Sequence, residues 1–116
     1  MFKVIVAGGR YFNNYTLLKT KLDTILSNIN DEIEIVSGCC SGADLLGERY
    51  ALEKGYKIKR FPANWSRGRK AGPERNEQMA KYANACVCFH DGISRGTANM
   101  IKNAKDYNIK LRIIKY

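Results

Sequence analysis

The sequence predicts one α/β domain of the Rossmann-like, three-layer type, built on a five-stranded, mainly parallel sheet. Its length of 116 residues suits a single domain spanning residues 1–116. Short apolar segments alternate with helical patterns along the chain, which is the order of a parallel sheet joined by right-handed β-α-β crossovers. Glycine-rich segments follow three of the predicted strands, where the loops of such a sheet approach ligands.

The first half of the chain contains two predicted strands and two predicted helices. Residues Lys3–Ala7 are apolar, largely β-branched and end at a glycine pair, as a buried strand does before a tight turn. Leucines and isoleucines recur at three- and four-residue spacings over Tyr15–Ile29, which predicts an amphipathic helix. Ile33–Ser37 is the second predicted strand. Ala43–Lys54 is the second helix, with Gly55 in the place of a left-handed cap.

The second half repeats the alternation. Tyr56–Phe61 alternates apolar and basic side chains, which predicts a third strand. Pro62–Gly72 is predicted to be a loop because it combines proline, asparagine, serine and glycine. Pro73 suits the first turn of a helix that runs to Asn84. The remaining predicted elements are a strand at Ala85–Phe89, a helix at Thr97–Tyr107 and a last strand at Ile109–Ile114.

The charge of the chain points to an anionic partner. Twenty Lys and Arg against eleven Asp and Glu give a formal net charge of +9, and phosphate is the first candidate for the anion. The N-terminal apolar segment, Val4–Ala7, is far shorter than a signal-peptide core or a membrane span of about 20 residues. We therefore expect no membrane association and a cytoplasmic location.

Cysteine spacing and two absent motifs narrow the function further. Cys39, Cys40, Cys86 and Cys88 lack the paired C-x-x-C spacing of zinc ribbons, so we expect small, buried side chains and neither a metal nor a cofactor. No G-x-G-x-x-G follows the first strand, and no Walker-type Lys and Ser/Thr pair is present. Both absences argue against a dinucleotide oxidoreductase and a P-loop NTPase.

Three loops combine glycine with small polar residues and are predicted to meet at one edge of the sheet. They are GGR after the first strand, SGCCSGAD after the second and DGISRGT after the fourth. Glycine lets backbone amides approach a ligand, and Ser and Thr hydroxyls add donors for phosphate. Each loop alone is compatible with an ordinary strand-to-helix turn, but three together predict a shared anion pocket. The predicted ligand-binding residues in these loops are Gly8, Gly9, Arg10, Ser37, Gly38, Ser41, Gly42, Asp44, Gly92, Ser94, Arg95, Gly96 and Thr97.

The stretch Lys59–Arg75 is strongly basic and contains Trp65. Arginine with an aromatic side chain suits a nucleotide, since the guanidinium binds phosphate and the ring stacks on a base. The alternative is a solvated basic loop with Trp65 packed on the core. Arg75 and Asn76 lie in the first turns of the predicted helix and are the best candidates for direct ligand contact.

Acid–base residues are few. His90 is the only histidine and directly follows the fourth strand, where a structural role is the simpler interpretation. Asp44 and Asp91 lie in the candidate loops and could each bind a ribose hydroxyl, although Asp44 could instead cap a helix. If the protein is an enzyme, Arg75, Asp44 and Asp91 are the candidate catalytic residues.

Five motifs in order carry a family resemblance. They are G-G-R, V-S-G-x-x-S-G-A-D, F-P-A-N-W, A-G-P-x-R-N-x-x-M and D-G-x-S-R-G-T, and together they extend from Val4 to about Ile114. This order resembles the YspA-like branch of the SLOG superfamily. The superfamily includes the Lonely Guy phosphoribohydrolases, which release a base from a nucleoside monophosphate, and DprA, which binds single-stranded DNA. The resemblance implies a Rossmann-like sheet and a nucleotide-type ligand.

The resemblance can be carried over residue by residue. The R-K-x-x-M motif of Lonely Guy enzymes resembles the segment with Arg75, Asn76 and Met79, which keeps the arginine and replaces the lysine. Their P-G-G-x-G-T-x-x-E loop resembles Gly92–Met100 and retains Gly96 and Thr97. The position of their catalytic glutamate falls on Asn99 or Met100. Since neither side chain is a carboxylate, this departure argues against the same glycosidic hydrolysis.

We therefore expect a binding module for a nucleotide or nucleotide-derived small molecule, acting as a sensor or processing module. The alternatives are a hydrolase of nucleotide N-glycosidic or phosphate bonds and a binder of single-stranded nucleic acid. Because Lonely Guy enzymes pair subunits around their sites, the resemblance also favours a homo-oligomer.

Overall fold

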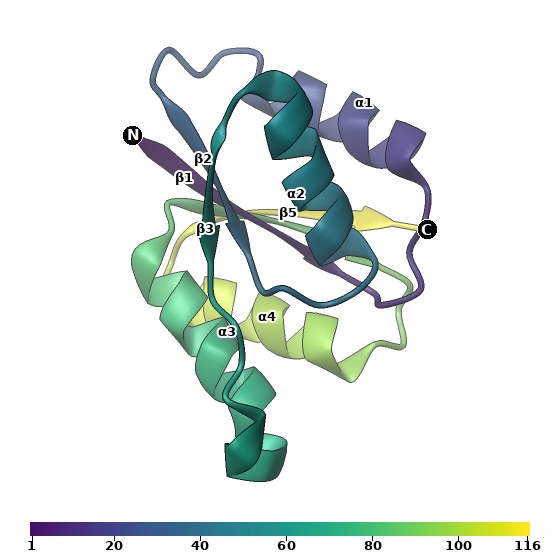
Figure 1. Ribbon diagram of the computed structural model, residues 1–116, viewed down its shortest axis with the longest axis vertical. Coiled ribbons are helices and arrows are strands. Elements are labelled where there is room, and N and C mark those ends of the chain that lie inside the picture. Colours follow the sequence, from purple (N-terminus) through teal and green to yellow (C-terminus); the bar gives the residue numbers. More distant parts are fainter.

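A central sheet of five parallel strands organises the computed structural model, which describes residues 1–116 (Figure 1). In space the strands follow the order β3-β2-β1-β4-β5, and every neighbouring pair is parallel. The strands are β1 Phe2–Gly8, β2 Ile33–Ser37, β3 Lys57–Arg60, β4 Ala85–His90 and β5 Lys110–Lys115. The predicted Rossmann-like, five-stranded architecture is confirmed, and the sheet is wholly rather than mainly parallel.

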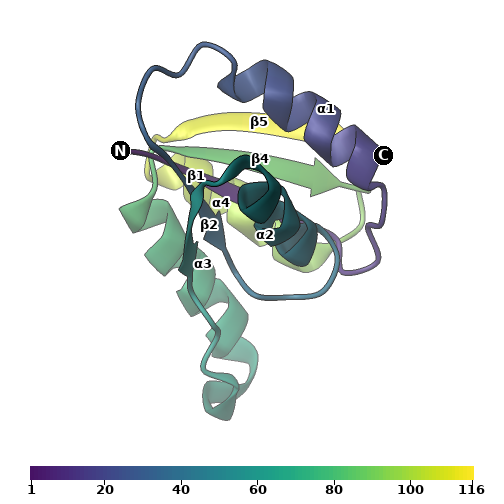
Figure 2. The ribbon, with the colours of Figure 1, turned by 45° about the horizontal axis from the view of Figure 1, so that its top comes forward.

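Two helix layers cover the sheet, one on each face (Figures 1 and 2). The helices are α1 Tyr15–Leu26, α2 Ala43–Lys54, α3 Ala71–Tyr82 and α4 Arg95–Asp106. On β1, Val4 and Val6 pack with α1 and α2, whereas Ile5 and Ala7 pack with α3 and α4. Both faces of the central strand are therefore buried, which explains its uninterrupted apolar sequence.

The strand order creates a crevice beside β1. From this central strand the chain builds β2 and β3 on one side and later β4 and β5 on the other. The loop after β1 leads to α1 on one face of the sheet, and the loop after β4 leads to α4 on the opposite face. Neighbouring loops that diverge in this way leave space at the carboxyl ends of their strands, and such a switch point is where ligands bind in open α/β sheets.

The segment predicted as a loop at Pro62–Gly72 is in part helical. Trp65–Lys70 forms short 3₁₀ turns (η1) interrupted at Gly68, which has a φ of +65°, and α3 begins at Ala71 rather than Pro73. Pro73 remains in the first turn of α3, where backbone N–H groups have no intrahelical acceptor, so its ring removes no hydrogen bond. Together η1 and the start of α3 project beyond the sheet (Figure 1).

Other boundaries differ from the prediction by a few residues. α4 begins at Arg95 rather than Thr97, because the Ser94 hydroxyl caps it by accepting the Thr97 N–H at 3.3 Å. α1 ends at Leu26 rather than Ile29. No helix is long and apolar enough to cross a bilayer.

Candidate functional site

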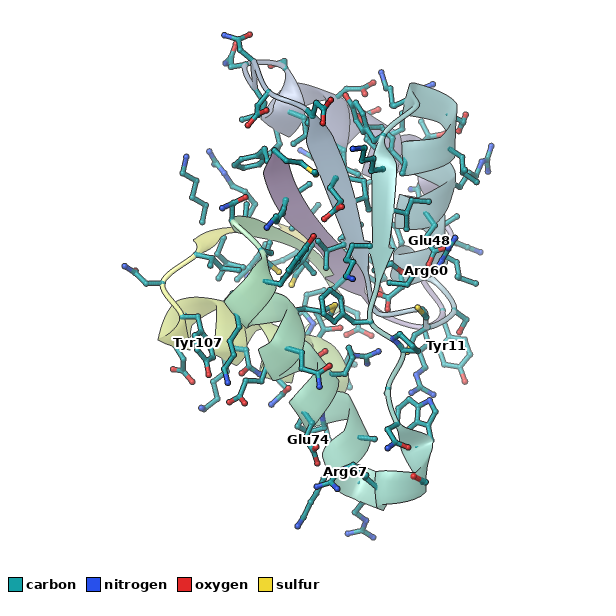
Figure 3. The ribbon with its side chains drawn as sticks, turned by 60° about the vertical axis from the view of Figure 1, so that its left-hand side comes forward. Tyr11, Glu48, Arg60, Arg67, Glu74 and Tyr107 are labelled. Carbon is teal, nitrogen blue, oxygen red and sulfur yellow. The ribbon has the colours of Figure 1, made fainter.

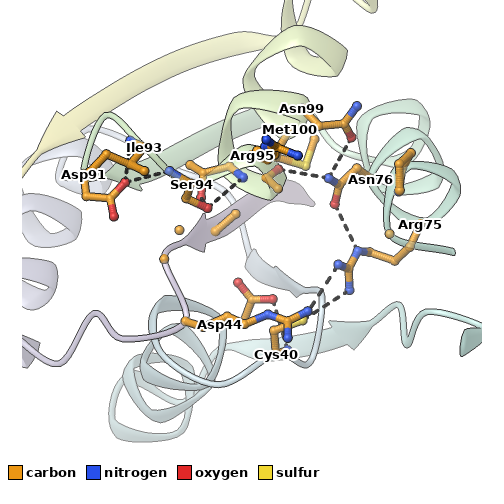
Figure 4. Close-up of a pocket in the computed structure, with 18 of the residues that line it drawn as sticks. Cys40, Asp44, Arg75, Asn76, Asp91, Ile93, Ser94, Arg95, Asn99 and Met100 are labelled. Atoms are coloured by element: carbon orange, nitrogen blue, oxygen red, sulfur yellow. Dashed lines mark hydrogen bonds between the residues drawn. The ribbon is translucent and has the colours of Figure 1, made fainter. Parts of the chain in front are cut away.

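A cavity of about 500 Å³ opens at the carboxyl ends of β1 and β4, in the crevice described above (Figure 4). Its walls come from the loops after these two strands, from the beginnings of α2, α3 and α4, and from Trp65 of η1. The volume lies within the range of roughly 300–1,000 Å³ that is typical of small-molecule sites.

Most of the candidate residues line this cavity, although they come from distant parts of the chain. Those in its wall are Gly8, Gly9, Arg10, Asp44, Trp65, Arg75, Asn76, Asp91, Ser94, Arg95, Gly96 and Thr97. Ser37, Gly38, Ser41, Gly42 and Gly92 do not line it. The fold thus brings together the loops after β1 and β4 and the start of α3, whereas the loop after β2 contributes only Cys40 and Asp44.

Several residues of the loop after β2 support the wall from behind. The Ser37 hydroxyl is buried, donates to Glu48 Oε2 at 2.6 Å and accepts the Cys39 N–H, so it is not free for a ligand. A Cβ on Gly38 would lie 2.8 Å from both Arg75 Nη1 and Asp44 Oδ2. Gly38 therefore leaves room for these two charged groups to reach the cavity wall.

Gly42 has a similar supporting role. Its φ of +80° suits glycine, and a Cβ there would meet the carbonyl of Gly9 and, at 2.6 Å, that of Arg10. The close contact fixes the loop after β1 against the start of α2, where the Ala43 N–H donates to the Gly9 carbonyl at 3.3 Å. Ser41 and Gly92 are exposed, and Gly92 has a φ of +89°.

Arg75 is the most buried cation of the site. It lies on α3, and only 8% of its surface is exposed. Nη1 donates to the Gly38 carbonyl, Nε donates to Asn76 Oδ1 at 3.0 Å, and the guanidinium lies 3.8 and 3.9 Å from the Cys40 sulfur. All these acceptors are neutral. The positive charge of Arg75 is thus held in the wall of the cavity without an ion pair to a carboxylate.

Asn76 connects α3 to α4 across the cavity. Its Nδ2 donates to the Gly96 carbonyl at 3.3 Å and to Asn99 Oδ1 at 2.9 Å. Asn99 is one of the two positions at which the resemblance places the catalytic glutamate of the Lonely Guy enzymes. A network of neutral amides therefore occupies this part of the wall (Figure 4).

The first turn of α4 faces the cavity with free backbone donors. Ser94 accepts the N–H and the hydroxyl of Thr97, while Asp91 Oδ1 accepts the N–H groups of Ile93 and Ser94 at 2.8 and 2.9 Å. These backbone donors lower the pKa of Asp91, the Ser94 N–H most of all. The N–H groups of Arg95 and Gly96 lie ahead of the first intrahelical bond, so they are available to an anion.

Asp44 lies opposite, in the first turn of α2, and 6% of its surface is exposed. Its Oδ2 accepts the Cys40 N–H at 3.2 Å, which is its only hydrogen bond within the chain. Burial raises the pKa of this carboxyl to about 6, although the Cys40 N–H and the positive charges of Arg75 and Arg10 act in the opposite direction. At neutral pH the carboxyl is therefore largely ionised, and no cation forms an ion pair with it.

The mouth of the cavity is apolar and exposed. Tyr11, Trp65, Ile93 and Tyr116 line it and belong to the nine large hydrophobic residues that the molecule exposes. Trp65 is 57% exposed, so the interpretation in which it packs on the core is wrong. The Arg10 guanidinium lies 5.8 Å from the centre of the Trp65 ring. Flat side chains beside a cation can stack against a planar ligand.

Some lining residues escaped the sequence analysis. Tyr11, Cys40 and Ile93 belong to loops that it singled out, but a large side chain in a loop gives no signal of its own. Tyr116 follows β5 and enters only because β5 lies beside β4. His90 does not line the cavity, and its buried Nδ1 has no hydrogen-bond partner. Among the cysteines, which are all free, Cys86 and Cys88 are buried, whereas Cys39 and Cys40 are partly exposed.

A basic patch, defined here as Arg67, Arg69 and Lys70 of η1, adjoins the mouth on the side of Trp65. Arg67 pairs with Glu74 of α3 at 2.9 Å, and Figure 3 shows this pair at the projecting tip of the molecule. Arg69 and Lys70 are exposed and form no ion pair in the chain.

The fold and the cavity define a Rossmann-like protein with a cavity at the switch point of its sheet. More particularly, residues 2–68 match the YspA, cpYpsA-related SLOG family. This match covers more than half of the chain, so the chain belongs to that family, as the motif order predicted.

Two individual proteins are similar to this chain. The chain is 28% identical over 116 residues to the Gene 61 protein of Mycobacterium phage D29, covering 94% of this chain and 93% of the relative. Among solved structures, DNA processing protein A (DprA) from Streptococcus pneumoniae matches with a TM-score of 0.76 at 18% identity, over 100% of this chain and 51% of DprA. The chain thus spans about half the length of DprA, and this likeness supports the fold alone.

Proposed function

We propose that this protein binds a nucleotide or a nucleotide-derived small molecule in the cavity, as a sensor or processing module. The observation that carries the proposal is Arg75, a buried cation in the cavity wall whose hydrogen-bond acceptors are all neutral. The Asp44 carboxyl is close enough for the Arg75 charge to act on it but forms no ion pair with Arg75, so an anionic ligand adds a direct partner for the buried guanidinium. Membership of the SLOG family supports a nucleotide-related function of this kind.

Two further features of the cavity favour a phosphate over other anions. Arg10 and Arg95 also line the cavity. The first turn of α4 adds free N–H groups and the positive end of the helix dipole, both of which face the cavity. The exposed aromatic mouth supplies a surface for a base, so phosphate and base have separate places.

Isothermal titration calorimetry with nucleoside mono-, di- and triphosphates tests the proposal. The best binder is then titrated into Arg10→Ala, Arg75→Gln and, as a matched control, Arg112→Ala. Arg112 is an exposed arginine of β5 outside the cavity. Losing a charged hydrogen bond to phosphate is expected to weaken binding about tenfold or more in the first two variants. The proposal fails if no nucleotide binds or if Arg112→Ala weakens binding as much as the cavity variants do.

Binding of single-stranded nucleic acid is the second candidate, favoured by the basic patch beside exposed Trp65. If Arg69 and Lys70 bind the phosphates of a short oligonucleotide, its affinity falls as the salt concentration rises. The expected slope is about 0.7 log units of affinity per tenfold increase in salt concentration for each phosphate neutralised. A mononucleotide confined to the cavity depends much less on salt. Titrations at two salt concentrations, with Arg69→Ala and Lys70→Ala, therefore separate the two functions.

Hydrolysis and self-association complete the set of proposals. Product analysis after incubation with the bound nucleotide tests cleavage of its glycosidic or phosphate bonds, with Asp44→Ala as the inactive comparison. A homo-oligomer stays a prediction that sedimentation velocity tests.

A further inference from the structure

We propose that Asp44 makes the cavity selective for ligands that carry a free ribose diol, so that ribonucleotides bind more tightly than 2′-deoxynucleotides. This inference rests on the proposed function and names the sugar of its ligand. The starting observation is a carboxyl in the cavity wall that has little solvent and few partners of its own. Figure 4 shows the Asp44 side chain on the α2 wall, across the cavity from Ser94 and the start of α4.

Asp44 presents acceptor capacity that the protein does not use. Its Oδ2 accepts one hydrogen bond, from the Cys40 N–H, and Oδ1 accepts none within the chain. Solvent can reach Oδ1 although Asp44 is buried, because this oxygen is not an orphaned buried atom. Since Asp44 lines the cavity, Oδ1 is open to a ligand there. An ionised carboxylate accepts about four hydrogen bonds, and a buried one is expected to have donors.

The loop after β2 is shaped to hold this carboxyl in place. Cys39 has a φ of +67°, an unusual conformation for a residue with a side chain, and its N–H is held by the Ser37 hydroxyl. The following N–H, that of Cys40, then donates to Asp44. Gly38 leaves open the space in which both Asp44 and Arg75 lie. Strained backbone of this kind is typical of sites where a side chain must be positioned.

The ligand group at Asp44 must donate hydrogen bonds. Phosphate offers only acceptors at neutral pH and is repelled by a carboxylate, so it belongs at the opposite wall, with Arg95 and the α4 amides. A base belongs at the aromatic mouth formed by Tyr11 and Trp65. In a nucleotide the sugar joins these two groups. The donors that reach Asp44 are therefore the 2′- and 3′-hydroxyls, which can bind one carboxylate together.

Paired nucleotides test the inference in the unmodified protein. AMP, GMP, CMP and UMP and their diphosphates are each titrated by calorimetry beside the 2′-deoxy counterpart. Because a hydrogen bond to a charged group is strong, we expect the best ribonucleotide to bind about tenfold or more tightly than its deoxy form. If nucleotides bind with equal ribo and deoxy affinities, the inference is overturned and the proposed function stands. If none binds, the proposed function fails and the inference fails with it.

Asp44→Asn assigns the selectivity to this residue. The amide keeps the size of the side chain and can still accept the Cys40 N–H, but it removes the charge. We expect ribonucleotide affinity to fall until the ratio of ribo to deoxy affinity is below about three. Asp106→Asn is the matched control, since Asp106 is exposed on α4, pairs with Lys102 and does not line the cavity. A tenfold ratio that persists in Asp44→Asn overturns the assignment to Asp44.

Discussion

Replacing Asp44 by Asn is expected to stabilise the ligand-free protein at neutral pH. The Asp44 carboxyl is buried, has one hydrogen bond and forms no ion pair, and this burial raises its pKa from 3.8 to about 6. Because the folded state holds this proton more tightly than the unfolded state, ionisation of Asp44 destabilises the fold. The penalty is absent below about pH 4, grows as the pH rises from 4 to 6 and is complete above 7.

The magnitude follows from the pKa. At about 1.36 kcal/mol for each pH unit, the rise from 3.8 to about 6 corresponds to an upper limit of about 3 kcal/mol. We expect Asp44→Asn to recover about 1–2 kcal/mol of this at pH 7.5, since the amide desolvates too and loses the attraction of Arg75 and Arg10. For a domain of this size the gain is equivalent to a rise in Tm of about 4–10 °C.

Urea denaturation of the wild type, Asp44→Asn and Asp106→Asn at pH 7.5 and 4.5 measures the effect. Groups that titrate in all three proteins cancel in the differences. Glu48 and Arg75, whose charges act on Asp44 from α2 and α3, are present in all three proteins. Asp44→Asn is expected to gain stability at pH 7.5 and most of the gain is expected to vanish at pH 4.5, whereas Asp106→Asn should change little at either pH. A variant that is less stable than the wild type at pH 7.5 would refute the reasoning, because the carboxylate would then have to be stabilised by a partner.

Three predictions about the free energy of unfolding follow from the fold, and urea denaturation checks each of them. Gly42→Ala drives a Cβ into the Gly9 carbonyl at a φ of +80°, so it is expected to lower the free energy of unfolding by at least about 2 kcal/mol. Gly55→Ala is the matched control: its Cβ would meet open space, and the expected loss is about 1 kcal/mol. Equal losses in the two variants would contradict the close contact at Gly42. Ser94→Ala removes the cap of α4 and should lose about 1 kcal/mol, and an unchanged midpoint would show that the cap is dispensable. Leu22→Ala, at a fully buried position of α1, should lose about 2–5 kcal/mol, and a loss below 1 kcal/mol would mean that α1 is not packed as described.

The fold could be predicted because its signals are local. β-branched segments such as Ile33–Ser37 and leucine spacing in the first helix identify the elements, and their alternation leaves few topologies. Boundaries were harder to predict where a side chain outside the element decides them. The cap at Ser94 lets α4 begin at Arg95, two residues before the start that the apolar pattern predicts. The turns of η1 lie in a segment whose composition is typical of a loop.

The sequence predicts the residues of the cavity only in part, because it does not show whether a loop residue faces the cavity or lies behind its wall. The sequence places Ser37, Gly38 and Asp44 in one loop at the edge of the sheet, but it does not tell which of them faces the ligand side. In the structure Asp44 lines the cavity, while Ser37 is bound to Glu48 and Gly38 lies behind the charged pair. Tyr116 could not be predicted, because its contribution depends on how far β5 extends beside β4.

The amide pair of Asn76 and Asn99 favours binding over hydrolysis of the Lonely Guy type. The resemblance places the catalytic glutamate of those enzymes at Asn99 or Met100, and the structure ties the Asn99 side chain to Asn76 and Asn103. An amide does not act as an acid or a base near neutral pH, and the Met100 side chain is apolar and buried. Two other carboxyls line the cavity: Asp91, whose Oδ1 already accepts two backbone N–H groups, and Asp44, which lies across the cavity on α2. Because neither occupies the position of that glutamate, a ribose contact by Asp44 requires less change from the observed arrangement than catalysis does.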